Sequence, residues 1–261
     1  MFAYRAPADR SDRPRGRPGS VGDAQLLTKL VELSEVGSTN DWIAAAAGRG
    51  ESDGLWVRAD RQTEGRGRRG RTWVSDTGNL FASCLVRPDA GEQPVHQFSF
   101  VAALALHDAL ANFAARDRLR LKWPNDVLLD GVKCAGILIE GRDEVVIVGC
   151  GANLAHHPEG TERPATSLPA AGLSAPSPSD TLAALASSFD KWRQLWRARG
   201  FLALRDAWLE RAAGLGEPIV ARLGRKEIPG RFSGIATDGA LELACPDGSV
   251  RRIHSGEVFS L

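Results

Sequence analysis

The sequence has little that would mark a disulfide-bonded or metal-binding protein. Only four cysteines occur among 261 residues, and no two have Cys-x-x-Cys spacing. Each lies among apolar or strand-like neighbours, which favours buried free thiols in a reducing compartment. Of the five histidines, His156 and His157 are adjacent instead of three or four residues apart, so we place them in a surface loop. We therefore expect no structural metal site.

Long apolar runs and excess charge of either sign are also lacking. No run approaches the roughly 18 apolar residues of a membrane span, and the first residues include Arg, Asp, Pro and Gly where a signal peptide has an apolar core. A cytoplasmic location follows by elimination. The net charge is only +1, so the chain as a whole does not attract polyanions. Residues 1–24 have little apolar periodicity and predict a disordered tail.

What the sequence does have is a basic, glycine-rich segment from Gln62 to Trp73. Its glycines allow backbone N–H groups to approach an anion, and guanidinium groups fit phosphate or carboxylate oxygens in pairs. Such a segment is expected to be mobile until an anion orders it. Three interpretations remain open from composition: a cradle for nucleotide phosphates, a nucleic-acid-binding arm, or a solvated loop. The arginines are Arg66, Arg68, Arg69 and Arg71.

The hydrophobic pattern predicts two domains, 25–213 and 214–261. In the first, strands and helices alternate, and Asp130-Gly131 is a strong hairpin signal. Beyond Gly214, short alternating runs at 219–223, 231–236, 241–244 and 250–254 predict a small β-barrel. The strands expected in the first domain are 31–36, 55–60, 80–86, 119–123, 127–129, 134–139 and 145–148; the helices are 38–48, 95–116 and 181–211.

Polar side chains gather at the ends of these predicted strands. Because they come from separate segments and meet at one sheet edge, a binding pocket is indicated. Each also has an ordinary alternative: Ser38 as a helix cap, Asn125-Asp126 as a turn, and Lys133 as a surface lysine. The set is Ser38, Thr39, Asn40, Gln62, Lys122, Asn125, Asp126, Lys133 and Asn153.

Six motifs, in order, resemble the signatures of biotin protein ligases, and the resemblance extends over about residues 30–261. It implies an α+β fold similar to class II aminoacyl-tRNA synthetases and lipoate ligases, a mixed sheet with helices on one side, plus an SH3-like C-terminal barrel. The motifs are Gly-Ser-Thr-Asn at 37–40, Gln62 with Gly-Arg-Gly-Arg-Arg-Gly-Arg-x-Trp at 65–73, Lys-Trp-Pro-Asn-Asp at 122–126, Lys133-x-Ala-Gly-Ile-Leu-x-Glu140, Gly-x-Gly-x-Asn153 and Ala-Thr-Ser-Leu at 165–168.

The resemblance implies a two-step reaction: biotin and ATP form biotinyl-5'-AMP, and biotin then passes to a lysine of a biotin carboxyl carrier protein. Mg²⁺ would be carried by the ATP. By resemblance, the catalytic residues are Lys133, Arg68 and Asp126. Those for biotin are Ser38, Thr39, Asn40, Gln62, Arg66, Gly67, Arg68 and Lys133. Those for ATP and the adenylate are Arg68, Arg69, Arg71, Trp73, Lys122, Asn125, Asp126 and Asn153.

Several expectations accompany the resemblance. Trp73 is either a lid on adenine or an anchor for its loop. Too few residues precede the first strand for a DNA-binding helix-turn-helix, so no DNA binding is expected; a homodimer is possible. Cys150 and Ala152 stand where the family more often has Ile or Leu. The rival activities are lipoate or octanoate ligation on the related fold and, outside enzymes, nucleic-acid binding through the Arg/Gly segment.

Overall fold

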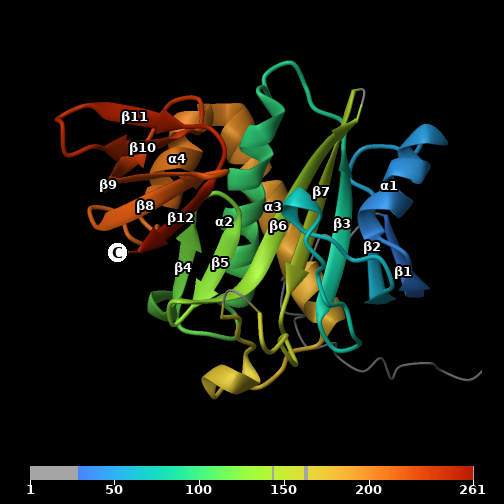
Figure 1. The fold of residues 1–261 in the computed structure, drawn as a ribbon. Coiled ribbons are helices and arrows are strands. Elements are labelled where there is room, and N and C mark those ends of the chain that lie inside the picture. The colour runs from blue at the N-terminus through green and yellow to red at the C-terminus, as the bar shows by residue number, and fades with distance from the viewer. Residues whose placement is uncertain (1–28, 143, 162–163, 261) are drawn as a thin grey trace, which may run out of the picture.

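The computed structural model describes residues 29–142, 144–161 and 164–260. The expected tail at 1–24 lies outside the described residues. Two β-sheets lie side by side with helices packed between and around them (Figure 1). Within the described residues, no helix has the length and apolar character needed to span a membrane.

The larger sheet has seven strands in the order β1-β2-β3-β7-β6-β5-β4. Only β1 and β2 run parallel, and the other neighbours are antiparallel, so the sheet is mixed as expected. Asp130 and Gly131 both have positive φ and form the tight turn between β5 and β6. The strands are β1 (Leu30–Val36), β2 (Trp56–Gln62), β3 (Leu80–Val86), β4 (Leu119–Lys122), β5 (Asp126–Leu129), β6 (Val132–Arg142) and β7 (Val145–Ala152).

Helices cover both faces of this sheet, so the expectation of helices on one side was wrong. Helix α2 (Phe98–Leu110) and helix α3 (Pro178–Arg199) share a core with alternate residues of β3 and β7, such as Cys84 and Val148. Helix α1 (Thr39–Gly48) packs on the opposite face, where Ile43 meets Leu85 and Ile147. The period-2 alternation of strand side chains supplies both cores, because neighbours along a strand point to opposite faces.

Two helices differ from the sequence prediction. The helix expected at 95–116 begins with a 3₁₀ turn at Val95–Gln97 and ends at Leu110, where the Asn112 amide donates to the carbonyls of Asp108 and Ala109. The helix expected at 181–211 is divided at Gly200, which adopts φ 73°. Helix α4 (Phe201–Leu209) then follows at a new angle, and its Phe201 ring lies 5.0 Å from Phe100 of α2.

The C-terminal domain is a five-stranded antiparallel sheet in the order β11-β10-β9-β8-β12, as expected for the small barrel. Its last strand was missed by the sequence prediction. The strands are β8 (Pro218–Leu223), β9 (Lys226–Ile235), β10 (Leu241–Ala244), β11 (Val250–Ile253) and β12 (Glu257–Ser260). The linker before it pairs with β4, since Leu121 N donates to Arg211 O and Ala213 N donates to Leu121 O.

The turn between β9 and β10 docks against the first domain. Trp123 donates its indole N–H to Gly239 O at 3.3 Å, and His96 Nε2 lies 2.6 Å from Asp238 O. A Cβ at Gly239 would lie 3.1 Å from Phe100, so glycine permits this close approach. Trp123 belongs to the Lys-Trp-Pro-Asn-Asp motif, and the C-terminal domain therefore contacts that motif directly.

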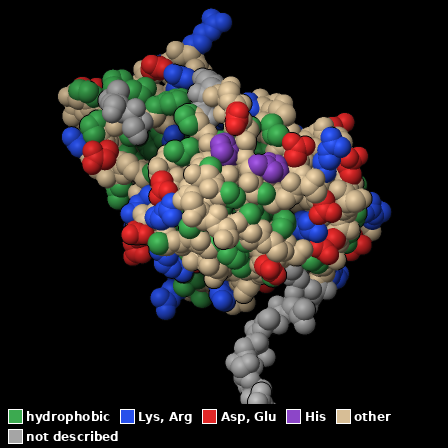
Figure 2. Space-filling view, turned by 90° about the horizontal axis from the view of Figure 1, so that it is seen from below, with side chains coloured by type: hydrophobic (Ala, Val, Ile, Leu, Met, Phe, Trp, Pro, Cys, Tyr) green, Lys and Arg blue, Asp and Glu red, His purple; other side chains and the backbone are tan. Residues whose placement is uncertain are grey.

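The four cysteines are free thiols. Cys84, Cys134 and Cys150 are buried as expected, whereas Cys245 is only half-buried. Burial raises the pKa of the Cys134 and Cys150 thiols to about 12, which keeps them protonated and unreactive. Figure 2 shows the face seen from below, where histidine side chains lie near the middle and most charged side chains lie toward the margins.

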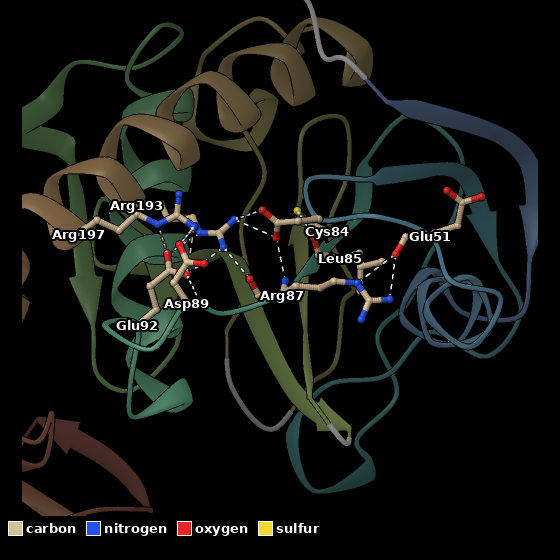
Figure 3. A network of polar contacts seen from close by, with 9 residues as sticks. Glu51, Cys84, Leu85, Arg87, Asp89, Glu92, Arg193 and Arg197 are labelled. Atoms are coloured by element: carbon tan, nitrogen blue, oxygen red, sulfur yellow. Dashed lines mark hydrogen bonds and ion pairs between the residues drawn. The ribbon is translucent and has the colours of Figure 1, made fainter.

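A buried ion network joins α3 to the loop between β3 and α2. Glu92 has no exposed surface and receives two hydrogen bonds from Arg193, at 2.6 and 2.9 Å, and another from Arg197 at 2.9 Å (Figure 3). Arg193 also pairs with Asp53 at 2.8 Å. Burial alone would raise the pKa of Glu92, but the hydrogen bonds from Arg193, the Asp89 backbone and Arg197 outweigh it and hold that pKa below its usual range.

This network predicts a large loss of stability for Glu92→Ala. The change leaves the buried Arg193 and the more exposed Arg197 without their shared carboxylate, and breaking a buried ion pair typically costs about 3–5 kcal/mol. Urea unfolding of both proteins measures the difference. Glu210→Ala is the matched control, because its pair with Arg211 is exposed and should contribute less than about 1 kcal/mol. A loss for Glu92→Ala no larger than that of the control would contradict the assignment.

Candidate active site

The Arg/Gly segment forms a short hairpin. Trp73 N donates to Gly65 O at 2.9 Å, Arg66 and Thr72 form an antiparallel bridge, and Gly67 N donates to Arg71 O at 2.7 Å. The tip is a 3₁₀ turn at Arg68–Gly70, in which Arg69 adopts φ 60°. The hairpin follows β2 directly, so its base is fixed by the sheet while its tip extends away from it.

A cavity of about 220 Å³ lies between this hairpin, the start of α1 and the face of the sheet that α1 covers. Of the residues expected to form a site, most line this cavity. They are Ser38, Thr39, Asn40, Gln62, Arg66, Gly67, Arg68, Arg71, Trp73, Asn125, Lys133 and Asn153.

Glycines on β6 and β7 form the floor of the cavity. Gly136 and Gly151 are cross-strand partners, and the Trp73 ring lies on both: a Cβ would lie 3.1 Å from the ring at Gly136 and 2.8 Å at Gly151. Lys133 Nζ lies 5.3 Å from the centre of the same ring, a cation–π contact. In this structure Trp73 therefore packs against the sheet, as an anchor of its hairpin does.

A chain of hydrogen bonds connects the start of α1 to the sheet. Gln62 Oε1 accepts from Thr39 N at 2.8 Å and from Thr39 Oγ1 at 3.0 Å, and Gln62 Nε2 donates to Ser75 Oγ at 3.1 Å. Ser83 Oγ on β3 lies 2.8 Å from Thr39 Oγ1 and donates to Asn40 Oδ1 at 2.6 Å. Fixed polar groups beside an apolar sheet face can orient a ligand that carries both donors and acceptors.

Arg66 pairs with two carboxylates. It donates to Asp41 at 2.6 and 2.8 Å and to Glu140 at 3.1 Å. The hydrogen bond from Arg66 is the main cause that lowers the pKa of Asp41, and Arg142 adds to it from 3.7 Å. Since its charge is already compensated, Arg66 fixes the base of the hairpin to α1 and β6.

Arg68 extends across the cavity from the hairpin tip. Its Nη1 donates to Asn125 Oδ1 at 3.3 Å, and Asn125 in turn donates to Ile137 O at 2.8 Å. Burial, together with the nearby Arg69, lowers the pKa of the Arg68 guanidinium. Arg68 therefore closes one side of the cavity by joining the hairpin to the turn before β5.

A second, smaller recess adjoins the cavity on the side of the C-terminal domain. Arg68, Arg71, Lys122, Asn125 and Asp126 line it together with Glu257 of β12. Glu257 pairs with Arg71 at 2.8 Å and lies 3.8 Å from Arg69. Asp126 pairs with Lys133 at 2.6 Å. Both cations and carboxylates therefore line this recess.

Three of the expected site residues do not line the main cavity. Lys122 and Asp126 lie in the adjoining recess, and Arg69 is exposed, turned toward Glu257. Asn153 is buried at the cavity wall, where its amide donates to Thr166 O at 3.0 Å. Thr166 N donates to Lys133 O at 2.8 Å, so the Ala-Thr-Ser-Leu motif lies beside β6.

Four residues that contact the site were not named as site residues from the sequence: Asp41, Ser83, Glu140 and Glu257. Glu140 entered only as the last residue of a quoted motif. Ser83 had a visible signal, since a serine stands alone among apolar residues in Leu80–Val86. Glu257 had none, because its strand was not predicted and its partner lies in the other domain. Among residues 29–142, 144–161 and 164–260, no cluster of three His, Cys, Asp or Glu side chains could hold a metal ion.

Comparison with known families agrees with this architecture. Residues 44–153 match the model of the biotin/lipoate A/B protein ligase family, and residues 214–260 match the biotin protein ligase C-terminal domain. Over 221 residues the chain is 45% identical to the biotin--[acetyl-CoA-carboxylase] ligase of Paracoccus denitrificans, covering 80% of this chain and 92% of that protein. It is 31% identical to the bifunctional ligase/repressor BirA of Bacillus subtilis, covering 93% of this chain and 80% of that one.

Solved structures give the same result. The biotin protein ligase of Aquifex aeolicus, in complex with biotin and ATP, matches with a TM-score of 0.78 at 28% identity and covers 90% of this chain and 100% of that one. The Leishmania major enzyme in complex with biotinyl-5-AMP matches with a TM-score of 0.63 at 26% identity, covering 87% of this chain and 99% of that chain. Fold and site define a protein ligase of the biotin/lipoate type. Within that class, the chain belongs to the biotin protein ligases.

The glycine floor generates a prediction for Gly151→Ala. The added methyl group would lie 2.8 Å from the Trp73 ring, so the ring must leave its place and take the hairpin with it. We expect biotin-dependent ATP–pyrophosphate exchange to fall about tenfold or more, as when a side chain is misplaced near reacting groups. Gly141→Ala on β6 is the control, because a Cβ there has no neighbour within 4 Å. Equal activity of the two variants would contradict the proposed importance of the Trp73 position on Gly151.

Proposed function

We propose that this protein activates biotin with ATP to form biotinyl-5'-AMP and transfers biotin to one lysine of a biotin carboxyl carrier protein. The proposal rests on one cavity that is lined by hydroxyl and amide side chains, by glycines of β6 and β7 and by arginine and lysine side chains. The chain that forms it is 45% identical to a named biotin ligase. Biotin is preferred over lipoate because the C-terminal residues 214–260 match the domain of biotin ligases.

Biotin is expected to lie at the α1 end of the cavity. Its ureido ring has N–H donors and a carbonyl acceptor, and Ser38, Thr39 and Gln62 present hydroxyl and amide groups there. The apolar ring and tail would lie beside the Trp73 ring that covers Gly136 and Gly151, with Lys133 and Gly67 at the carboxylate end. Arg66 would contribute at the base of the hairpin.

The nucleotide is expected at the other end, beside the adjoining recess. In the first step a biotin carboxylate oxygen attacks the α-phosphorus, and the bond to the leaving pyrophosphate breaks. Both reactants are anions, so positive charge is the main requirement. Arg68, Arg71, Lys122 and Lys133 provide it, and Asn125 and Asn153 supply amide groups. Arg69 and Trp73 are the remaining residues that we propose to lie around the nucleotide.

In the second step the carrier lysine amine attacks the acyl carbon of the mixed anhydride, and AMP leaves. Asp126 is the proposed partner of the incoming ammonium, because its carboxylate lies in the recess and already pairs with a lysine, Lys133. Water destroys this anhydride, so closing the hairpin over it protects the intermediate. We propose that the hairpin is mobile until biotin and the adenylate order it.

Three further expectations belong to this proposal. Mg²⁺ would arrive with ATP and neutralise its phosphates, with Asp126 and Asn125 as the nearby oxygen donors in the recess. Dimerisation through the large sheet and absence of DNA binding remain predictions, which sedimentation and a DNA-binding titration would measure. Nucleic-acid binding by the Arg/Gly hairpin is disfavoured because Arg66 and Arg71 are already paired with carboxylates.

ATP–pyrophosphate exchange tests the proposal directly. Purified protein is incubated with ATP and labelled pyrophosphate, and biotin, lipoate, octanoate or no acid is added. We expect exchange with biotin alone, followed by labelling of a carrier domain at one lysine. Exchange that depends on lipoate or octanoate would overturn the assignment in favour of the related ligases. Absence of any exchange would overturn adenylate chemistry.

The charge requirement predicts that Lys133→Ala slows adenylation more than it weakens biotin binding. Loss of one preorganised electrostatic donor typically costs on the order of a hundredfold in rate. Single-turnover formation of biotinyl-AMP measures the rate, and calorimetry measures biotin binding. Lys191→Ala, an exposed lysine on α3, is the control. A wild-type adenylation rate in Lys133→Ala would remove Lys133 from the mechanism.

The contact of Arg68 with Asn125 predicts a leaking enzyme for Arg68→Gly. Without this contact the hairpin tip is released and biotinyl-AMP escapes, so bystander proteins should be biotinylated on exposed lysines. Labelling of added serum albumin, detected with streptavidin, measures the leak. Arg225→Gly, in an exposed turn of the C-terminal domain, provides the comparison. Equal albumin labelling by the two variants and the wild type would refute retention by Arg68.

A further inference from the structure

Glu140, near the end of β6, contacts two segments of the proposed biotin site. Its Oε2 accepts from Asn40 Nδ2 at 2.6 Å, and both carboxylate oxygens accept from Arg66 Nη2 at 3.1 Å. Asn40 belongs to the first turn of α1 and Arg66 to the base of the hairpin. One carboxylate therefore joins two segments that approach the cavity from different parts of the chain.

The contacts close a ring. Asp41, the neighbour of Asn40 on α1, also pairs with Arg66 at 2.6 Å. The path from Asn40 through Glu140 and Arg66 returns to Asp41, so the start of α1 and the hairpin base are held at a fixed separation. Hydrogen bonds to charged groups contribute more than neutral ones, typically about 1.5–3 kcal/mol each.

Both polar atoms of the Asn40 side chain already have a protein partner. Its Oδ1 accepts from Ser83 and its Nδ2 donates to Glu140, and the residue is only 4% exposed. Gly149 gives it room: a Cβ at that position would lie 2.4 Å from Asn40 Oδ1. The contacts of Asn40 therefore fix the turn that presents Ser38 and Thr39 to the cavity.

We infer that Glu140 is a positioning residue for biotin, acting through Asn40 and Arg66. The inference rests on the proposed function and assigns a residue to it. Glu140 holds the polar wall and the hairpin base at the distance that biotin requires. Neither Glu140 nor Asn40 lines the recess that contains Lys122 and Asp126. The hairpin residues that do line it, Arg68 and Arg71, have their own contacts with Asn125 and Glu257, so we expect the nucleotide end to keep its place without Glu140.

The experiment compares Glu140→Ala, Glu140→Gln and wild type in steady-state adenylation, with KM for biotin and KM for ATP measured separately. Glu140→Ala removes both contacts, and we expect KM for biotin to rise about tenfold or more while KM for ATP stays within about twofold. Glu140→Gln keeps an oxygen for Asn40 and should recover most of the loss. Glu35→Ala is the control, because its pair with Arg61 on the same sheet is exposed.

Two further variants test whether Asn40 transmits the effect. The double variant Asn40→Ala/Glu140→Ala should have a KM for biotin no higher than that of the more impaired single variant, because both changes break the same hydrogen bond. Gly149→Ala displaces Asn40 from the other side and should reproduce the rise in KM for biotin alone. If thermal unfolding shows that Glu140→Ala does not fold, Gly149→Ala provides the test in its place.

An unchanged KM for biotin in Glu140→Ala, or an equal rise in both KM values, would overturn the inference. So would full additivity of the double variant. These outcomes differ from failure of the proposed function, because in that case the wild-type protein itself would form no biotinyl-AMP.

Discussion

The site depends on the absence of side chains from one patch of the large sheet. Gly136, Gly149 and Gly151 leave the backbone of β6 and β7 bare on the face that α1 covers. Trp73 lies directly on this patch and Asn40 enters it from the side, and the space that remains is the cavity. With any larger residue at Gly149 or Gly151, the strands would still pair, but the hairpin and the start of α1 would lose their places.

Charge is arranged around this patch in pairs that join distant segments. Arg66 connects the hairpin to α1 and β6, Arg71 connects it to Glu257 of the C-terminal domain, and Lys133 pairs with Asp126. An arginine-rich hairpin with unpaired charges would repel itself. Pairing with carboxylates offsets this repulsion, and the pair of Arg71 with Glu257 connects the small C-terminal domain to the hairpin.

Most of the fold could be predicted because hydrophobic periodicity and turn residues are local signals. Strand Leu80–Val86 and the hairpin at Asp130-Gly131 are confirmed. The helix expected at 95–116 was too long because Asn112 competes for the last carbonyls of the helix. The helix expected at 181–211 is broken because Gly200 allows α4 to turn back onto Phe100. Apolar residues keep helical spacing across both positions, so the sequence pattern does not show where these helices end.

The sequence by itself determined the family, the order of the elements and most of the polar side chains that line the cavity, because motifs are short and their chemistry is local. Only the tertiary structure decided what each side chain contacts. Arg66 and Arg69 look alike in the sequence, yet one is held between Asp41 and Glu140 while the other is exposed beside Glu257. The physical reason is that ion pairs and hydrogen bonds depend on distances of about 3 Å between groups far apart in the chain, and only folding fixes those distances.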